Sequence, residues 1–372
     1  MTSTPPSKAD GENGPIQAMV VGASDVVAGL VSKILESDPR IDVAARPANG
    51  PEAVSRFRTL QAEAVVMDIG GAGDNALTTL SRLLRIDPEV RVIMVSTLTY
   101  ANVKTAMEGL ERGAAEYMQT PAAHTKERSL AVFRHNLAET VLGLGQTRRR
   151  AGKRKVISGK ARVADKPIEL RRESMLPPEV LVIGSSTGGP QALMAVIKAL
   201  PDAVTVPILI AQHMPPGFTA SLAANIEEKS GRPAAEGKDG EILEKGRVYM
   251  APGDYHMVIE RSDGKVRIRI NQEKRENYCR PSADPLFRSV ASVFGAKTLA
   301  TVLTGMGNDG EAGARIIAEA GGTVVAQDEA TCVVWGMPKA VAEAGLCSAV
   351  LPLGDIAGHL GKLFTGGEKQ AK

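Results

Sequence analysis

The chain has few aromatic residues. They make up 3% of its 372 residues and include a single tryptophan. Proteins that bind single-stranded nucleic acids stack the bases on aromatic side chains, so this composition argues against that class of ligand. The formal net charge is only +3, and so no strong field favours a nucleic acid either. We therefore expect no nucleic-acid partner.

Cysteines and long apolar runs are also scarce. The three cysteines, Cys279, Cys332 and Cys347, fit no C-x-x-C or metal-ligand spacing, and we expect buried thiols in a reducing compartment. No run approaches the roughly 18 apolar residues of a membrane-spanning helix. The polar segment 1–15 lacks the apolar core of a signal peptide, and we expect it to be disordered. These absences predict a cytoplasmic protein without membrane insertion.

The first part of the chain alternates short apolar strands with amphipathic helices, which predicts a doubly wound parallel (βα)5 sheet over residues 16–145. Strands are expected at 18–21, 41–44, 64–67, 91–95 and 116–118. Helical spacing of apolar residues appears at 26–35, 51–60, 77–86, 103–111 and 125–142. Ligands of such sheets bind at the carboxyl ends of the strands.

A basic segment follows at residues 146–178, where eleven lysines and arginines face three acidic residues. No apolar period survives there, and so we predict a linker between domains. The simplest interpretation is a solvated spacer, and the alternative is attraction to an acidic partner or to lipid headgroups. The polar end, residues 366–372, is expected to be disordered.

Residues 179–365 predict a second α/β domain with a mostly parallel sheet. Strands are expected at 180–183, 206–211, 247–250, 257–259, 266–270, 299–303 and 323–326. Helices are expected at 191–200, 217–228, 283–294, 311–320 and 336–344. The turn Ser262-Asp263-Gly264 indicates a β-hairpin on this sheet.

The clearest chemical signal is a strand that begins at Val180 and is followed by a glycine-rich turn and a helix. The turn Gly184-Ser185-Ser186-Thr187-Gly188 matches the pattern G-x-S-x-G, with Ser186 at its centre. Pro190 suits the first turn of the helix that follows. Such a turn can cradle a phosphate at the helix N-terminus or present a serine nucleophile, and the pattern alone does not decide between them.

A serine nucleophile needs a base and a carboxylate that orients the base. His213 follows the strand 206–211, after Gln212, which places it at the same edge of the sheet as Ser186. We favour it as the base over His256, which we interpret as a pocket-wall or structural residue. We interpret the other histidines as surface or packing residues; they are His124, His135 and His359.

Asp309 is the candidate carboxylate, because it lies in the glycine-rich loop after the strand 299–303. It could instead cap the helix expected at 311–320. Three catalytic residue types at three strand ends are a stronger signal than any one of them. Their order along the chain, Ser–His–Asp, differs from that of the α/β-hydrolases, and so an ordinary lipase or esterase fold is disfavoured.

Several blocks of the second domain resemble the bacterial chemotaxis protein-glutamate methylesterases (CheB), in order and in spacing. The blocks are 184–190, 212–218, 251–254, 280–282, 303–310 and 327–338. The resemblance implies hydrolysis of glutamyl methyl esters on methyl-accepting chemotaxis receptors with release of methanol, and deamidation of receptor glutamines. It also implies that the catalytic step uses no metal and no cofactor.

The resemblance also implies the roles of individual residues. Ser186 would be the nucleophile, His213 the general base and then acid, and Asp309 the orienting carboxylate. The backbone N–H of Met306 would bind the oxyanion, and Thr187 and Gly188 would shape the same pocket. Two other functions stay open: a signalling adaptor with vestigial catalysis, which the complete triad argues against, and a hydrolase of another cytoplasmic ester.

The first domain resembles a response-regulator receiver, in which Asp68 occupies the phosphate-accepting position. In that family an acidic pair after the first strand holds Mg²⁺ and a lysine follows the fifth strand; here those positions hold Gly22, Ala23 and Thr120. Only Asp68 and Ser96 remain of the family's phosphorylation residues. The loop after Asp68 also lacks the family's Met-Pro step.

From these departures we predict a degenerate receiver that binds Mg²⁺ weakly or not at all and is not phosphorylated in the ordinary way. Asp25 is expected to cap the first helix rather than to replace a metal ligand. The esterase would then be constitutively active or controlled by a protein partner at residues 94–117. That partner would be a chemotaxis histidine kinase or another signalling protein.

Overall fold

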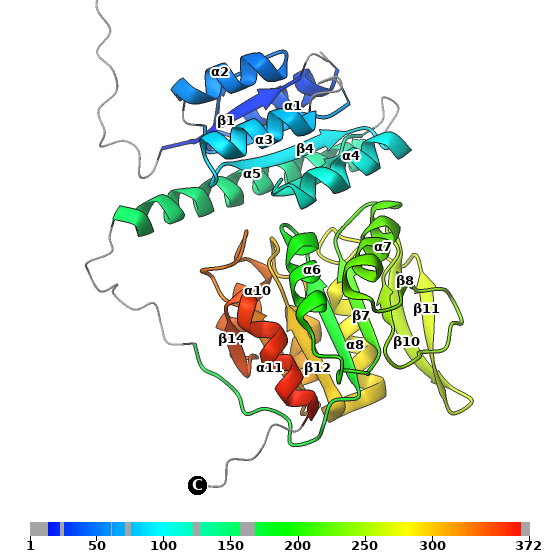
Figure 1. Cartoon of the computed structure of the whole chain (residues 1–372). Coiled ribbons are helices and arrows are strands. Elements are labelled where there is room, and N and C mark those ends of the chain that lie inside the picture. The colour runs from blue at the N-terminus through cyan, green and yellow to red at the C-terminus, as the bar shows by residue number, and fades with distance from the viewer. Residues whose placement is uncertain are drawn as a thin grey trace, which may run out of the picture. The chain divides into compact units, whose positions relative to one another are not determined.

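The structure, a computed structural model, describes residues 14–22, 26–60, 62–70, 76–121, 127–156 and 168–365. The ends that we expect to be disordered fall outside these ranges, apart from residues 14 and 15, as do Ala23, Asp25 and His124. The chain separates into two compact units, residues 1–160 and 161–372, called here the first and the second unit (Figure 1). None of the helices in the described ranges is both long and apolar enough to cross a membrane.

The first unit is the predicted five-stranded parallel sheet, with strand order β2-β1-β3-β4-β5. Its strands are β1 (Ile16–Val21), β2 (Ile41–Ala45), β3 (Ala64–Asp68), β4 (Arg91–Ser96) and β5 (Glu116–Gln119). Its helices are α1 (Val27–Glu36), α2 (Gly50–Leu60), α3 (Ala76–Ile86), α4 (Tyr100–Glu111) and α5 (Glu127–Val156). Helices α1 and α5 pack together on one side of the sheet, and α2, α3 and α4 form the other layer.

Helix α5 continues beyond the end that the sequence predicts for it, through the first part of the expected linker. Arg148 pairs with Asp87. Arg149 pairs with Glu63, with 2.8 Å between Nη2 and Oε2, and donates to the carbonyl oxygen of Gly14, also at 2.8 Å. These basic residues therefore hold the helix to its own unit. The sequence pattern does not reveal this, because the partners lie on other elements.

The last part of the expected linker, residues 168–178, lies against the second unit. Ile168 packs on that unit's core. The Arg171 backbone N–H donates to the carbonyl oxygen of Cys347 at 2.8 Å, and the Ser174 hydroxyl donates to that of Ala296, also at 2.8 Å. This stretch is thus an ordered strap rather than a solvated spacer.

The second unit is built on a seven-stranded sheet of order β14-β13-β12-β6-β7-β9-β8, and every pairing in it is parallel. Its strands are β6 (Val180–Ser185), β7 (Ile208–Gln212), β8 (Ala234–Glu236), β9 (Val248–Met250), β12 (Thr298–Val302), β13 (Thr323–Gln327) and β14 (Ala349–Leu351). The edge strands β8 and β14, of three residues each, were not predicted.

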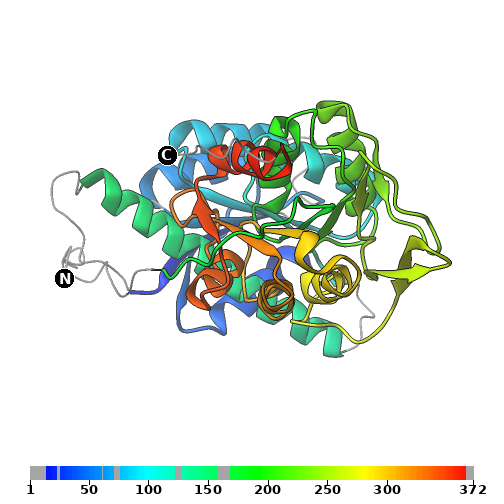
Figure 2. The ribbon, with the colours of Figure 1, turned by 90° about the horizontal axis from the view of Figure 1, so that it is seen from below.

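Helices cover both faces of this sheet (Figure 2). One layer holds α6 (Gly189–Ala199), α7 (Phe218–Ser230) and α11 (Leu353–Thr365), and the other holds α8 (Ala283–Phe294), α9 (Glu311–Glu319) and α10 (Met337–Glu343). A short 3-10 turn, η2 (Gly295–Lys297), joins α8 to β12.

The predicted hairpin forms from β10 (His256–Ser262) and β11 (Lys265–Asn271), but it makes a separate two-stranded sheet. The expectation that it lies on the main sheet is therefore wrong. Instead β11 is hydrogen-bonded to the loop between β8 and β9. The Gly240 N–H donates to the carbonyl oxygen of Ile268, and the Ile268 N–H donates to that of Glu241, both at 2.8 Å. The hairpin is thus paired with this loop and not with a strand of the main sheet.

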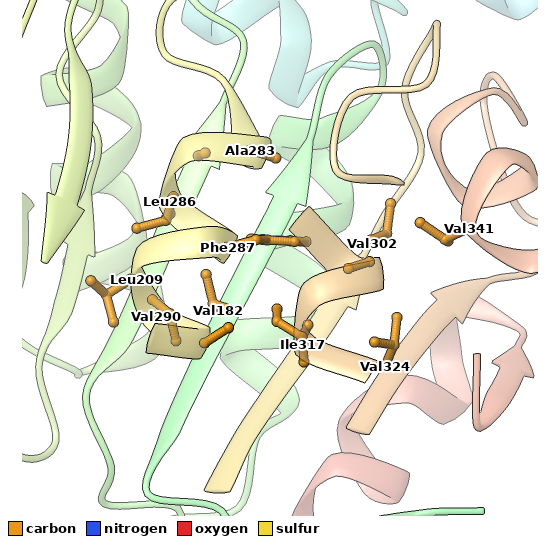
Figure 3. Close-up of a cluster of buried hydrophobic side chains, with 14 of the residues drawn as sticks. Val182, Leu209, Ala283, Leu286, Phe287, Val290, Val302, Ile317, Val324 and Val341 are labelled. Atoms are coloured by element: carbon orange, nitrogen blue, oxygen red, sulfur yellow. The ribbon is translucent and has the colours of Figure 1, made fainter. Parts of the chain in front are cut away.

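The core between the sheet and α8 fixes the geometry of the site. Phe287 of α8 is fully buried near the middle of this cluster, among valines and leucines of the strands (Figure 3). A Cβ on Gly184 would lie 2.9 Å from Ala283 Cβ and 3.2 Å from the Phe287 ring. Helix α8 can approach β6 this closely only because residue 184 has no side chain. Its N-terminus is thereby brought to the carboxyl end of β6.

Candidate active site

Ser186 lies directly after β6, at the N-terminus of α6, and is partly exposed. Its backbone N–H donates to the carbonyl oxygen of Thr304 at 3.0 Å. The turn depends on Gly188, whose φ of +74° is left-handed. A Cβ at that position would lie 2.5 Å from Val333 Cβ, so only glycine fits.

His213 follows β7, next to β6 in the sheet, where Ser185 and Gln212 are register partners. The buried Gln212 ties the two strand ends together. Its amide nitrogen donates to the carbonyl oxygens of Ser186 at 3.0 Å and of His213 at 3.2 Å, while its amide oxygen accepts from the Ser185 hydroxyl at 2.6 Å. Sequence reasoning missed Gln212, although a polar residue that closes a buried apolar strand is a usable signal.

Asp309 is 1% exposed and does not cap the helix that follows it, because Gly310 holds that position. The carboxylate lies instead at the N-terminus of α8, where its Oδ2 accepts from the Ala283 N–H at 2.6 Å and its Oδ1 from the Asp284 N–H at 3.2 Å. His213 Nε2 is 2.6 Å from Oδ2. The capping alternative is thus wrong for α9. A carboxylate at a helix N-terminus is stabilised by the N–H groups and by the helix dipole.

The two partners of this hydrogen bond shift each other's pKa. Burial alone raises the pKa of Asp309, but the hydrogen bonds from His213, Ser282 and Ala283 outweigh it and hold that pKa well below its ordinary value. Burial alone lowers the pKa of His213, but the neighbouring Cys279 and Asp309 raise it well above its ordinary value. The pair therefore favours an imidazolium next to a carboxylate.

Because Nε2 is engaged by Asp309, a proton from Ser186 would have to go to Nδ1. Among the described residues, the Ser186 hydroxyl forms no hydrogen bond with the His213 ring. Catalytic hydrogen bonds are often long or absent until substrate binds. The serine, the imidazole and the carboxylate nonetheless follow the carboxyl ends of β6, β7 and β12, respectively, and these three strands are adjacent in the sheet.

The loop after β12 passes close to Ser186. A Cβ on Gly305 would lie 2.8 Å from Ser186 Cβ, so the loop can approach only because residue 305 is glycine. Within the described ranges no group accepts a hydrogen bond from the next backbone N–H, that of Met306. Thr187 is buried, and its carbonyl oxygen accepts from the Thr304 hydroxyl at 2.9 Å. A free N–H beside a serine suits an oxyanion.

The other histidines that the structure describes lie apart from this hydrogen-bonded group. His256 is buried, and its Nε2 is 3.1 Å from the carbonyl oxygen of Lys274, so it supports the loop after the hairpin. Burial lowers the pKa of His256, which favours its neutral form. His135 lies on α5 and His359 on α11.

Asp68 lies in the first unit, at the end of β3, and is 2% exposed. Its Oδ1 accepts from the Gly70 N–H at 2.9 Å. The Ser96 hydroxyl is 3.1 Å from the hydroxyl of Tyr117. Thr120, at the lysine position, is buried after β5, and its N–H donates to the carbonyl oxygen of Ser96 at 2.8 Å.

The residues described around Asp68 do not fit a magnesium site. Gly22, at the position of one expected carboxylate, adjoins Asp68: a Cβ there would lie 3.0 Å from Asp68 Cβ. The structure places no cluster of three or more metal-ligating residues anywhere in its described ranges. Mg²⁺ is held by oxygen ligands, carboxylates above all, and among these residues Asp68 alone supplies a carboxylate.

Comparisons with known proteins agree over both units. A family model described as CheB methylesterase matches residues 181–360, and one described as response regulator receiver domain matches residues 18–129. A protein of Rhodospirillum rubrum named "Protein-glutamate methylesterase/protein-glutamine glutaminase 1" is 45% identical over 366 residues, which are 93% of this chain and 95% of that protein. A protein of Azospirillum brasilense with the same name, without the numeral, is 42% identical over 94% of this chain and 92% of its own length.

Among solved structures, the CheB methylesterase catalytic domain of Thermotoga maritima is similar at 44% sequence identity and a TM-score of 0.49. It covers 50% of this chain and 100% of its own.

Proposed function

This chain belongs to the CheB family of protein-glutamate methylesterases, and we propose that Ser186, His213 and Asp309 perform its ester hydrolysis. The reaction is the hydrolysis of glutamyl methyl esters to glutamate and methanol. Methyl-accepting chemotaxis receptors are the proposed substrate. Deamidation of glutamine side chains would follow the same steps with ammonia as the leaving group.

In the first half-reaction the Ser186 hydroxyl attacks the ester carbonyl carbon while His213 Nδ1 takes its proton. The resulting imidazolium is stabilised by Asp309 through Nε2. The Met306 N–H and the N-terminus of α6 face the developing oxyanion. His213 then gives its proton to the departing methoxide, methanol leaves, and a glutamyl ester of Ser186 remains.

The second half-reaction repeats these steps with water as the nucleophile. His213 removes a proton from the water, which attacks the glutamyl–Ser186 ester, and a second oxyanion occupies the same position. The proton returns to Ser186 as the free glutamate side chain leaves. A raised pKa of His213 suits both roles, since the same ring must accept a proton and then donate it.

The observation that carries this proposal is the 2.6 Å hydrogen bond from His213 Nε2 to a fully buried, charge-stabilised Asp309. If Asp309 served only as a helix cap, it would have no need of a hydrogen bond to the imidazole. If it formed only a solvent-exposed ion pair with His213, it would have no need of the backbone N–H donors at the start of α8.

The nucleophile can be tested with methylated receptor membranes. We expect Ser186→Ala to lose methanol release entirely above the uncatalysed background, because no other hydroxyl is proposed to take its place. The matched control is Ser348→Ala, which removes a hydroxyl before β14, and its rate should equal that of the wild type. Residual turnover by Ser186→Ala at the wild-type rate would contradict the assignment.

For the first unit we propose a receiver fold that does not switch by ordinary phosphorylation of Asp68. Glycine replaces a carboxylate beside that aspartate, and Thr120 replaces the lysine. The esterase would then be constitutively active or controlled by a protein partner that binds at residues 94–117. A chemotaxis histidine kinase or another signalling protein is the proposed partner, and the cytoplasm remains the predicted location.

A further inference from the structure

The loop between β11 and α8 passes beside the buried Asp309 and is anchored at several points. Glu276 forms a two-pronged ion pair with Arg288 of α8, at 2.9 and 2.5 Å. The Arg280 guanidinium donates to Asp254 at 3.0 Å. The Cys279 N–H donates to the carbonyl oxygen of Glu276 at 2.8 Å, which closes a tight turn.

The two residues inside that turn have left-handed backbones, with φ of +50° at Asn277 and +62° at Tyr278. Asparagine adopts this conformation more readily than most residues, whereas tyrosine rarely does. Such a conformation is unfavourable for most residues and persists where the surroundings enforce it. Besides the backbone hydrogen bond that closes it, the turn is held in place by side-chain contacts.

The Asn277 side chain makes those contacts with two buried carboxylates. Its amide nitrogen donates to Asp309 Oδ1 at 2.9 Å and to Asp284 Oδ2 at 2.9 Å. An amide nitrogen carries two hydrogens, so each carboxylate receives one. Asp309 is 1% exposed and Asp284 is 4% exposed.

Two carboxylates this close repel each other unless donors lie between them. Burial and the charge of Asp309 raise the pKa of Asp284 to about 6, although its hydrogen bonds from Gly313 and Asn277 oppose that rise. The other titratable groups that interact with these two carboxylates are His213 after β7, His256 of β10 and Arg288 of α8. Cys279 of the loop acts on His213, and Glu276 acts on His256 and Arg288. None of the lysines or arginines is hydrogen-bonded to either carboxylate, in so far as these residues are described, so the donors to the pair other than His213 are neutral.

We propose that Asn277 is a positioning residue of the esterase: its amide, placed between Asp284 and Asp309, holds the Asp309 carboxylate in the orientation that His213 requires. Asn277 does not touch the reacting atoms, and it acts through Asp309. The Ser282 hydroxyl completes the arrangement from α8, donating to the same Oδ1 at 2.7 Å. This inference rests on the proposed function.

The test compares methanol release by the full-length wild type and by Asn277→Gly across the acid side of the pH profile. Glycine keeps the left-handed backbone and removes only the amide. We expect kcat to fall about 10- to 100-fold, as for the loss of a hydrogen bond to a charged group, with KM unchanged. The acid limb should move to higher pH, because Asp309 with one donor fewer binds the His213 imidazolium more tightly and raises its pKa.

A second variant separates shape from hydrogen bonding. Asn277→Asp keeps the size of the side chain, and aspartate adopts the left-handed backbone conformation of this position. It replaces the two N–H donors with a third negative charge. We expect it to lose at least as much activity as Asn277→Gly. Asp263→Gly, in the hairpin turn, is the matched control for a glycine at a left-handed position and should behave as the wild type.

Wild-type kcat and an unmoved acid limb in Asn277→Gly, or wild-type activity in Asn277→Asp, would overturn the proposal. So would the loss of cooperative unfolding in both variants, followed by the fluorescence of Trp335, because the role would then be purely structural. If the wild type itself releases no methanol while remaining folded, the proposed function falls and this inference falls with it.

Discussion

At the scale of single residues, the site is defined by how one buried carboxylate is satisfied. Asp309 accepts hydrogen bonds from six donors: His213, Asn277, Ser282, Ala283, Asp284 and Gly310. A buried charge without such partners would be strongly unfavourable. Four of these donors come from the loop before α8 and from the first turn of that helix. They hold the carboxylate in place independently of His213.

This arrangement predicts the pH dependence of the reaction. The base must be neutral, and Cys279 and Asp309 together raise the pKa of His213, so activity should fall as the pH drops through that raised value. In Asp309→Asn the attraction for the imidazolium is lost. The acid limb of kcat/KM should therefore move to lower pH, while kcat falls by about 10²–10⁴ because the imidazole is no longer oriented or stabilised.

The measurement is the rate of methanol release from methylated receptors as a function of pH, with Asp355→Asn as the control. Asp355 is an exposed residue in the first turn of α11, and its variant should reproduce the wild-type profile. An acid limb that stays in place in Asp309→Asn would mean that Asp309 does not set the pKa of the base.

At the scale of elements, the site depends on how closely α8 packs against β6. The Ala283 N–H at the start of α8 can reach Asp309 only if the helix lies this near the sheet. Gly184 permits that approach from the strand. On the side of α9, a Cβ on Gly313 would lie 2.5 Å from Phe287 Cβ. Glycines in the core thus control the position of the Asp309 carboxylate.

Gly184→Ala should therefore weaken both folding and catalysis. Its new Cβ would lie 2.9 Å from Ala283 Cβ, and overpacking of this kind costs about 1–3 kcal/mol in the free energy of unfolding. Displacement of Ala283 would also disturb Asp309, so kcat should fall. Denaturant unfolding can be followed by Trp335, which is the only tryptophan and lies in the second unit.

The matched control is Gly358→Ala in α11, where nothing lies within 4 Å of the added Cβ. This variant should be as stable as the wild type or more stable by about 0.5–1 kcal/mol, since alanine is the better helix former. If Gly184→Ala unfolds at the same denaturant concentration as the wild type, the close approach of α8 to β6 does not limit stability, which would contradict this account.

The alternation of apolar strands and amphipathic helices was enough to predict the two sheets and most elements around them, because buried parallel strands are nearly all apolar. Ser186, His213 and Asp309 could be proposed from strand ends alone. Asn277 and Ser282 could not, because their roles depend on side-chain contacts between distant segments. Gln212 was missed although its position at the end of a buried apolar strand is a usable signal. The extension of α5 was missed for the same reason, since Arg148 and Arg149 pair with residues far along the chain.

At the scale of the whole molecule, the chain joins an esterase unit, with the proposed triad, to a receiver fold that keeps Asp68 and Ser96 but has Gly22, Ala23 and Thr120 where the family has its acidic pair and its lysine. The strap at residues 168–178 lies on the esterase unit, so a fragment intended to carry catalysis should begin at or before residue 168 rather than at 179. The regulation of this enzyme would then differ from that of a receiver driven by phosphorylation.

The most direct test of this account is methanol release from methylated receptor membranes by the full chain, with and without a small-molecule phosphodonor and Mg²⁺. Ser186→Ala provides the blank. We predict clear methanol release that depends on Ser186 and is the same with and without the phosphodonor. A rate that rises when the phosphodonor is added would contradict the proposed receiver, and release that persists in Ser186→Ala would contradict the proposed site.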